Sequence, residues 1–136
     1  MNVQHVVYII VINWNGWQDT IACLDSLASL DYTNYHVLVV DNGSKDDSVA
    51  RIHAAHPEVP ILETGHNLGF SGGCNVGIRR ALEEGADYVW LLNNDTTVNP
   101  QALNAMVAVA EADPKVGAIG SVLYYLDNPK DIQAWG

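Results

Sequence analysis

The chain has 136 residues, 49% of them apolar, and a formal net charge of −10 with only six Lys and Arg. This length suits one domain over residues 1–136, and the many Val, Ile and Leu residues argue against disorder. A nucleic-acid groove is excluded because it needs basic side chains against phosphates, and the longest apolar run is far shorter than the roughly 20 residues of a membrane helix.

Three strands and two helices are predicted in the first half of the chain. Val6–Asn13 is a continuous apolar run rich in β-branched residues, which is typical of a strand buried on both faces. The capping-box spacing of Asn15 and Gln18 and apolar residues at helical intervals predict an amphipathic helix over residues 16–29. The next predicted elements are, in order, the strand Tyr35–Val40, a short helix that starts at Ser44 and Asp47 and runs to about Ala55, and the strand Val59–Glu63.

Two more helices and two more strands are predicted in the second half. The loop Thr64–Ser71 is rich in Gly and Asn, and the helix after it ends at Gly85, a residue type that commonly terminates helices. This helix places four apolar side chains on one face, those of Cys74, Ile78, Ala81 and Leu82. The remaining predicted elements are the strand Tyr88–Leu92, a helix with Asn99 as its N-cap and Pro100 in its first position that ends at Asp113 and Pro114, and a fifth extended segment, Val116–Leu126.

The alternation of strands and helices predicts an α/β fold with a mainly parallel sheet and helices on both faces. Ligands of such folds bind beyond the carboxyl ends of the strands, near the point where the strand order reverses. Three predicted strands end in polar triplets, which are Asn13-Trp14-Asn15, Asp41-Asn42-Gly43 and Asn93-Asn94-Asp95. Turn formation explains any one triplet, since Asn, Asp and Gly are turn residues, but three at one sheet edge favour a binding site.

Asp95 is the sharpest candidate for chemistry because it directly follows a buried strand. A carboxylate in that place suits Mg²⁺ or Mn²⁺, which favour oxygen ligands and often share them with substrate phosphates. A metal ion would also allow this acidic chain to bind a diphosphate. The alternative, to which we give equal weight from the local sequence, is that Asp95 caps the turn before Pro100.

Asp41 and Trp14 are candidates for contacts with a nucleoside. The Asp41 carboxylate can accept a hydrogen bond from a pyrimidine N3–H or a ribose hydroxyl, although an Asx-turn with Asn42 and Gly43 also explains this residue. Trp14 can stack on a nucleobase or cover the sheet edge. The chain has neither a GxGxxG turn after the first strand nor a Lys at P-loop spacing, which argues against a dehydrogenase and an NTPase.

A glycine-rich segment follows the third predicted strand. Glycines permit a ligand to approach the backbone closely, and the N-terminus of the following helix favours anions. Tight packing of the loop and helix is the competing explanation. The residues concerned are Asn67, Gly69, Gly72, Gly73, Asn75 and Gly77.

Four collinear motifs resemble the inverting family 2 glycosyltransferases, most closely those of the bacterial rhamnosyltransferase type. The motifs are VINWNG (11–16), VVDNGSKDDS (39–48), NLGFSGGCNVGI (67–78) and ADYVWLLNNDTTVNP (86–100). The resemblance implies a Rossmann-like GT-A fold and transfer of a sugar from a dTDP-, UDP- or GDP-linked donor to a saccharide or lipid-linked acceptor. It further implies Mg²⁺ or Mn²⁺ as the cofactor and a place in cell-wall or polysaccharide biosynthesis.

The resemblance also assigns residues to the donor site. Asn93-Asn94-Asp95 falls at the DXD position of the family with Asn93 in place of the first acid, so Asp95 is the expected metal ligand and Asn93 a weak one. The expected nucleotide-sugar contacts are Asn13, Trp14, Asn15, Asp41, Asn42, Asn67, Gly69, Gly72, Asn75, Asn94 and Asp95.

The catalytic base of the family is a carboxylate well beyond the DXD region, in the acceptor-binding half. Asp127 and Asp131 lie in the tail, but nothing aligns them with that role. We therefore expect the base beyond Gly136 and expect residues 1–136 to be a donor-binding portion that is inactive alone.

Two other functions compete with this interpretation. One is a non-catalytic nucleotide-binding module, and the other is a sugar nucleotidyltransferase, which needs a basic residue in a Gly-rich loop that Asn13–Trp17 does not provide. Cys23 and Cys74 form no disulfide framework, and no signal peptide is expected. These features favour a location in the cytoplasm or at the inner face of the membrane.

Overall fold

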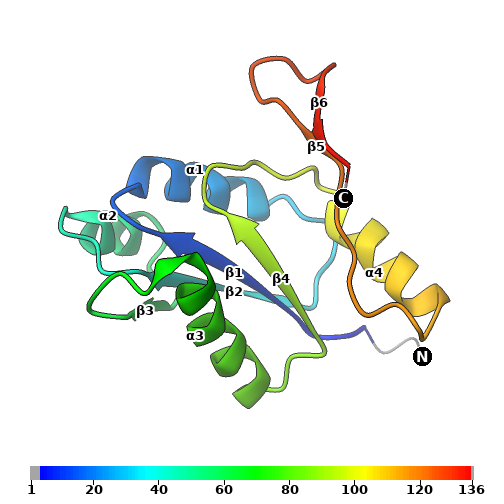
Figure 1. The fold of residues 1–136 in the computed structure, drawn as a ribbon, viewed down its shortest axis with the longest axis horizontal. Helices are drawn as coiled ribbons and strands as arrows, with labels where there is room; N and C mark the ends of the chain where they lie inside the picture. Colours follow the sequence, from blue (N-terminus) through cyan, green and yellow to red (C-terminus); the bar gives the residue numbers. More distant parts are fainter. Residues whose placement is uncertain (1–3, 136) are drawn as a thin grey trace. The chain divides into compact units, whose positions relative to one another are not determined.

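The computed structural model describes residues 4–135 (Figure 1). The chain divides into two compact units. The first unit covers residues 1–25 and 34–96, and the second covers residues 26–33 and 97–136. The elements of the first unit are β1 (Val7–Asn13), α1 (Trp17–Leu27, whose last residues belong to the second unit), β2 (Tyr35–Asp41), α2 (Ser48–Ala55), β3 (Ile61–Glu63), α3 (Gly69–Glu83) and β4 (Tyr88–Asn93). Those of the second unit are α4 (Ala102–Ala112), β5 (Leu123–Tyr124) and β6 (Ile132–Ala134).

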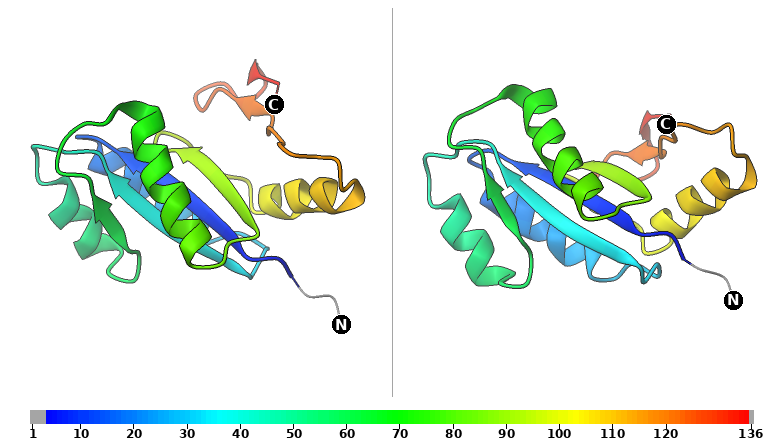
Figure 2. Two further views of the ribbon diagram at one scale, coloured as in Figure 1. Left: turned by 60° about the horizontal axis from the view of Figure 1, so that its bottom comes forward. Right: turned by 90° about the horizontal axis from the view of Figure 1, so that it is seen from below.

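A four-stranded parallel sheet in the order β3-β2-β1-β4 forms the centre of the first unit. The register places Asn13 of β1 beside Asp41 of β2, and Ile12 of β1 beside Asn93 of β4. The carboxyl ends of these three strands therefore meet at one edge, and the strand order reverses between β1 and β4. Figure 2 shows α3 on one face of the sheet and α1 and α2 on the other, which confirms the predicted α/β class.

The core of the first unit is formed by the central strands and the helices that cover them. The β-branched residues Ile9, Ile10 and Val11 of β1 are fully buried, as expected for a strand covered on both faces. Helix α3 packs very closely at Gly77, where a Cβ atom would lie 2.6 Å from Cγ2 of Ile10 and 3.2 Å from Cγ2 of Val40. Tight packing, the competing explanation for the glycine-rich segment, thus accounts for Gly77.

The fifth predicted strand is not part of the parallel sheet. Residues 116–122 form no strand, and only Leu123–Tyr124 pairs with a neighbour, antiparallel to Ile132–Ala134. The prediction of a fifth strand over Val116–Leu126 is therefore wrong for most of its length. Residues 122–126 are exposed, and Gly117 and Gly120 weaken a strand.

Three local predictions about helices also need correction. Helix α1 begins at Trp17, and Oδ1 of Asn15 accepts a hydrogen bond from the Lys45 N–H at 2.8 Å instead of capping this helix. Asp47 is the N-cap residue of α2, but its side chain makes no capping hydrogen bond. Leu82 is 61% exposed and does not share the buried face of α3.

The second unit contains a helix and a small hairpin. Helix α4 buries Leu103 and begins at Ala102, two residues after the predicted Pro100. Asn99 is not the N-cap residue: its Oδ1 accepts from the Gln101 N–H at 2.9 Å in a turn that precedes the helix. Over residues 4–135, no helix has the length and apolar character needed to cross a membrane.

Candidate functional site

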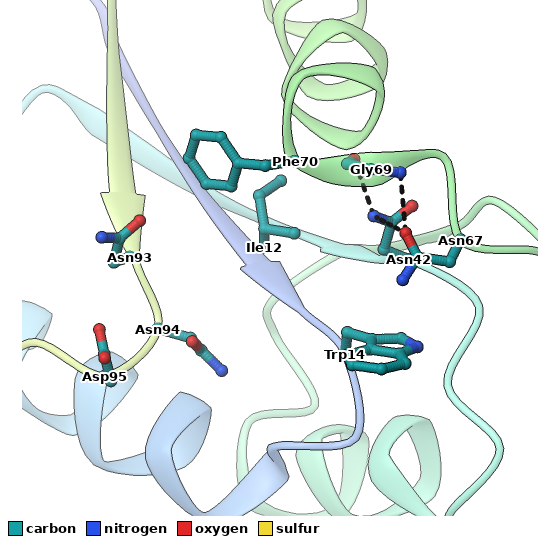
Figure 3. A pocket seen from close by; sticks show the side chains of 9 residues that line it. All are labelled: Ile12, Trp14, Asn42, Asn67, Gly69, Phe70, Asn93, Asn94 and Asp95. Carbon is teal, nitrogen blue, oxygen red and sulfur yellow. Dashed lines mark hydrogen bonds between the residues drawn. The ribbon is translucent and has the colours of Figure 1, made fainter.

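A cleft of about 390 Å³ lies at the carboxyl ends of β1, β2 and β4. It belongs entirely to the first unit and sits where the strand order reverses, the usual ligand position in open α/β sheets. Figure 3 shows the side chains that surround it, which come from four separate stretches of the chain. They are Ile12, Trp14, Asn42, Asn67, Gly69, Phe70, Asn93, Asn94 and Asp95.

Trp14, the residue directly after β1, lines the cleft, whereas Asn13 at the end of the strand points into the protein. Trp14 is 55% exposed, so its indole ring is available for stacking, whereas Asn13 is fully buried. Asn15, which has a positive φ of 50°, holds the loop after β2, because its Oδ1 accepts from the N–H groups of Lys45 (2.8 Å) and Asp46 (3.3 Å).

A buried hydrogen-bond network lies at the ends of β1 and β2. The Asp41 carboxylate is 3% exposed and accepts from Asn13 Nδ2 at 2.9 Å, from the Ser44 hydroxyl at 2.6 Å and from the Ser44 N–H at 3.0 Å. Asn13 Oδ1 in turn accepts from the Thr20 hydroxyl of α1 at 2.7 Å. The three donors to Asp41, from Asn13 and Ser44, compensate the desolvation of its carboxylate. Asp41 therefore joins the ends of the two strands without lining the cleft.

Asn42 organises the loop that begins α3. Its Oδ1 accepts from the Leu68 N–H at 3.0 Å. Its Nδ2 donates to Asn67 Oδ1 at 3.2 Å and to the Gly69 carbonyl at 3.0 Å (Figure 3). Gly43 next to it has a φ of +80°, and a Cβ there would lie 2.5 Å from the carbonyl carbon of His66. Only glycine combines that backbone conformation with so close an approach of the two loops.

The end of β4 supplies the polar wall of the cleft. Asn94 is partly buried and its Nδ2 donates to Thr20 Oγ1 at 3.1 Å, while Asn93 and Asp95 are exposed. The Thr96 hydroxyl donates to the Asn93 carbonyl at 2.6 Å and tightens the turn. Beneath this turn, burial raises the pKa of the Cys23 thiol to about 11, and the negative charge of Asp95 adds to the shift.

The structure brings together seven of the residues that the sequence predicted for the site. Those that line the cleft are Trp14, Asn42, Asn67, Gly69, Asn93, Asn94 and Asp95, and those that do not are Asn13, Asn15, Asp41, Gly72 and Asn75. Sequence reasoning missed Ile12 and Phe70. Ile12 follows the pattern of a buried strand, and Phe70 stood in a predicted loop, but α3 begins at Gly69 and leaves Phe70 58% exposed in the cleft.

The donor chemistry of the cleft fits a hard divalent cation that is shared with a ligand. Asp95 is the charged side chain among the nine lining residues, and amide oxygens of Asn93 and Asn94 stand near it in the chain. Within the described residues 4–135, no three His, Cys, Asp or Glu side chains gather into a complete metal site. Mg²⁺ commonly binds one or two carboxylates and completes its shell with phosphate oxygens and water, which suits this incomplete set.

The chain is similar to known glycosyltransferases over most of its length. The model for "Glycosyl transferase family 2" matches residues 8–134. A galactofuranosyltransferase of Mycobacterium tuberculosis is 27% identical over 125 residues, which are 90% of this chain and 41% of that protein. An N-acetylglucosaminyl-diphospho-decaprenol L-rhamnosyltransferase of the same species is 30% identical over 95 residues, which are 64% of this chain and 31% of that protein.

A solved structure shares the fold over most of the chain. The mannosyltransferase PcManGT from Pyrobaculum calidifontis, in complex with GDP-Man and Mn²⁺, matches with a TM-score of 0.79 at 24% identity. The match covers 91% of this chain and 37% of that one. The chain thus spans less than half the length of each of these three proteins.

Proposed function

The chain belongs to glycosyl transferase family 2 and has the GT-A fold, and from this premise we propose that its cleft binds a nucleoside diphosphate sugar. The observation that carries the proposal is the position of the cleft at the carboxyl ends of three parallel strands, where the strand order reverses. The nine residues around it combine an exposed indole ring, several amides and one carboxylate, a set suited to a base, a ribose and a metal-bound diphosphate.

The proposed reaction is transfer of the sugar to an acceptor hydroxyl with inversion at the anomeric carbon. A general base takes the hydroxyl proton as the acceptor oxygen bonds to the anomeric carbon, and the bond from that carbon to the diphosphate oxygen breaks. The relatives are named for galactofuranosyl, L-rhamnosyl and mannosyl transfer, and the motifs lead us to propose the rhamnosyl type. The donor would carry dTDP, UDP or GDP, and the acceptor would be a saccharide or a lipid-linked sugar of glycan assembly.

Each part of the cleft has a proposed role in donor binding. Trp14 stacks on the nucleobase, and the backbone at Asn67 and Gly69, which Asn42 holds in place, lines the nucleotide. Asp95 holds Mg²⁺ or Mn²⁺ with a weaker contribution from Asn93, and the ion, when bound, neutralises charge on the leaving diphosphate. The buried residues Asn13 and Asp41 act from behind the cleft by fixing the strand ends.

Thermal unfolding in the presence of nucleotides tests the proposal. We expect at least one of UDP, dTDP and GDP with Mn²⁺ to raise the melting temperature by roughly 10 °C at about 100 times its Kd. In the Asp95→Asn variant, which keeps the size of the side chain but removes its charge, the increment due to Mn²⁺ should disappear. A folded wild-type chain that none of the three nucleotides stabilises would contradict donor binding.

A further inference from the structure

A line of directed hydrogen bonds runs behind the cleft from Asp41 to Asn94. The Asp41 carboxylate can only accept, and it accepts from Asn13 Nδ2 at 2.9 Å. This contact turns the amide oxygen of Asn13 toward α1, where it accepts from the Thr20 hydroxyl at 2.7 Å. The hydroxyl has then donated its proton, so its oxygen accepts from Asn94 Nδ2 at 3.1 Å.

This order leaves Asn94 with one orientation of its amide group. The Nδ2 atom also faces the carbonyl of Gly16 at 3.5 Å, so both nearby protein groups are acceptors that select the nitrogen. A Cβ atom on Gly16 would lie 3.1 Å from that nitrogen, so the glycine gives the amide the room it occupies. Because the nitrogen of Asn94 donates to these protein groups, the amide oxygen is the atom that Asn94 presents to a ligand in the cleft, where it can accept a hydrogen bond.

We propose that Thr20 is a positioning residue of the donor site: its hydroxyl orients Asn94 so that an amide oxygen, not an N–H group, serves the ligand beside Asp95. This inference rests on the proposed function. An oxygen there suits a hard cation or a hydroxyl group of the bound nucleotide, whereas an N–H group would repel the cation. Thr20 is fully buried, with 0% of its surface exposed, so it acts through Asn94 and does not touch the ligand.

The test is a double-mutant cycle on ligand affinity in the full chain. Thr20→Val keeps the shape of the side chain and removes the hydroxyl, Thr20→Ser keeps the hydroxyl, and Asn94→Ala removes the group through which Thr20 is proposed to act. Affinity for UDP, dTDP and GDP with Mn²⁺ is measured by isothermal titration below the melting transition of each variant. Thr20→Ala replaces Thr20→Val in the cycle if the valine variant does not fold.

We expect Thr20→Val to weaken binding of the preferred nucleotide by about three- to tenfold, the effect of one lost hydrogen bond, and Thr20→Ser to stay within about twofold of wild type. In the Asn94→Ala background, Thr20→Val should cause no further loss. The same titrations in EDTA show what the amide oxygen of Asn94 contacts. The loss of affinity caused by Thr20→Val disappears in EDTA if that oxygen binds the metal ion, and it persists if the oxygen accepts from a hydroxyl group of the nucleotide.

Two results would overturn the inference alone. One is binding by Thr20→Val equal to wild type, and the other is an undiminished loss in the Asn94→Ala background, which would mean that Thr20 acts through the general stability of the fold. A wild-type chain that binds none of the nucleotides would instead overturn the proposed function, and the inference with it.

Discussion

The thiol of Cys23 lies directly beneath the turn that carries Asp95, with its sulfur 3.9 Å from the carbonyl oxygen of Asn93. Burial raises its pKa from an ordinary 9.0 to about 11, since the thiolate would lose its hydration there, and the Asp95 charge opposes ionisation further. The folded chain therefore holds this proton more tightly than the unfolded chain. The stability contributed by this difference is complete below pH 9 and is lost as the pH rises toward 11.

We predict that the free energy of unfolding of the wild type falls more steeply above pH 9 than that of a Cys23→Ala variant. Urea titrations of both proteins between pH 7.5 and pH 10.5 measure the difference. The pKa values of Tyr8 and Tyr35 are also raised, but both proteins contain these tyrosines, so their contribution cancels in the comparison. A difference between wild type and variant that stays constant over this range would show that the Cys23 thiol does not titrate as the structure implies.

Single residues also mark where sequence reasoning reaches its limit. Asp95 and Trp14 were predicted correctly as residues at one sheet edge, because a position just after a strand places a side chain at that edge. Asp41 has the same kind of position, but its neighbour Ser44 folds back and buries it, and this depends on the loop after β2. Phe70 had no signal, since its exposure follows from α3 beginning at Gly69.

At the scale of secondary structure elements, the parallel strands were the most predictable part of the fold. Strands β1, β2 and β4 lie within one residue of their predicted bounds because each is a mostly apolar run that stops at polar residues. The fifth segment has similar composition but no partner in that sheet, and pairing depends on distant residues that local sequence does not reveal. The prediction of which α3 side chains are buried was wrong at Leu82 for the same reason, since that residue is exposed.

Close contact of α3 with the sheet leads to a prediction about stability. Gly77→Ala should destabilise the chain by about 1–3 kcal/mol, because the added Cβ would meet Ile10 at 2.6 Å and α3 would have to shift. This loss should outweigh the gain in helix propensity of about 1 kcal/mol that alanine brings. Asn75→Ala on the exposed side of the same helix is the matched control, and it should be neutral or slightly stabilising.

Urea titration of the two α3 variants gives the required free energies. A Gly77→Ala variant as stable as wild type would mean that α3 moves away from the sheet without cost, and the glycine would then need another explanation. The cleft provides a second readout, since α3 carries Gly69 and Phe70 at its N-terminus, so a shift of the helix should also weaken nucleotide binding.

At the scale of the whole molecule, charge is the property that most constrains the ligand. The chain carries a formal net charge of −10, and none of its six Lys and Arg lines the described cleft. A nucleoside diphosphate would therefore enter a field of its own sign, and the side chains offer it no direct ion pair. A divalent cation next to Asp95 would reverse this local sign, so the composition supports the proposed role of Mg²⁺ or Mn²⁺ in nucleotide binding.

The sign of the salt effect on nucleotide binding follows from this charge balance. Without divalent ions, raising NaCl from about 0.01 M to about 0.15 M shortens the screening length from about 30 Å to about 8 Å, which weakens repulsion between the chain and the nucleotide. We predict that affinity for the preferred nucleotide in EDTA rises by at least about threefold over this range. With saturating Mn²⁺ the change should be smaller, because the ion already neutralises the diphosphate. Isothermal titration at the two salt concentrations measures both effects, and metal-free affinity that falls with added salt would mean that a basic group reaches the diphosphate after all.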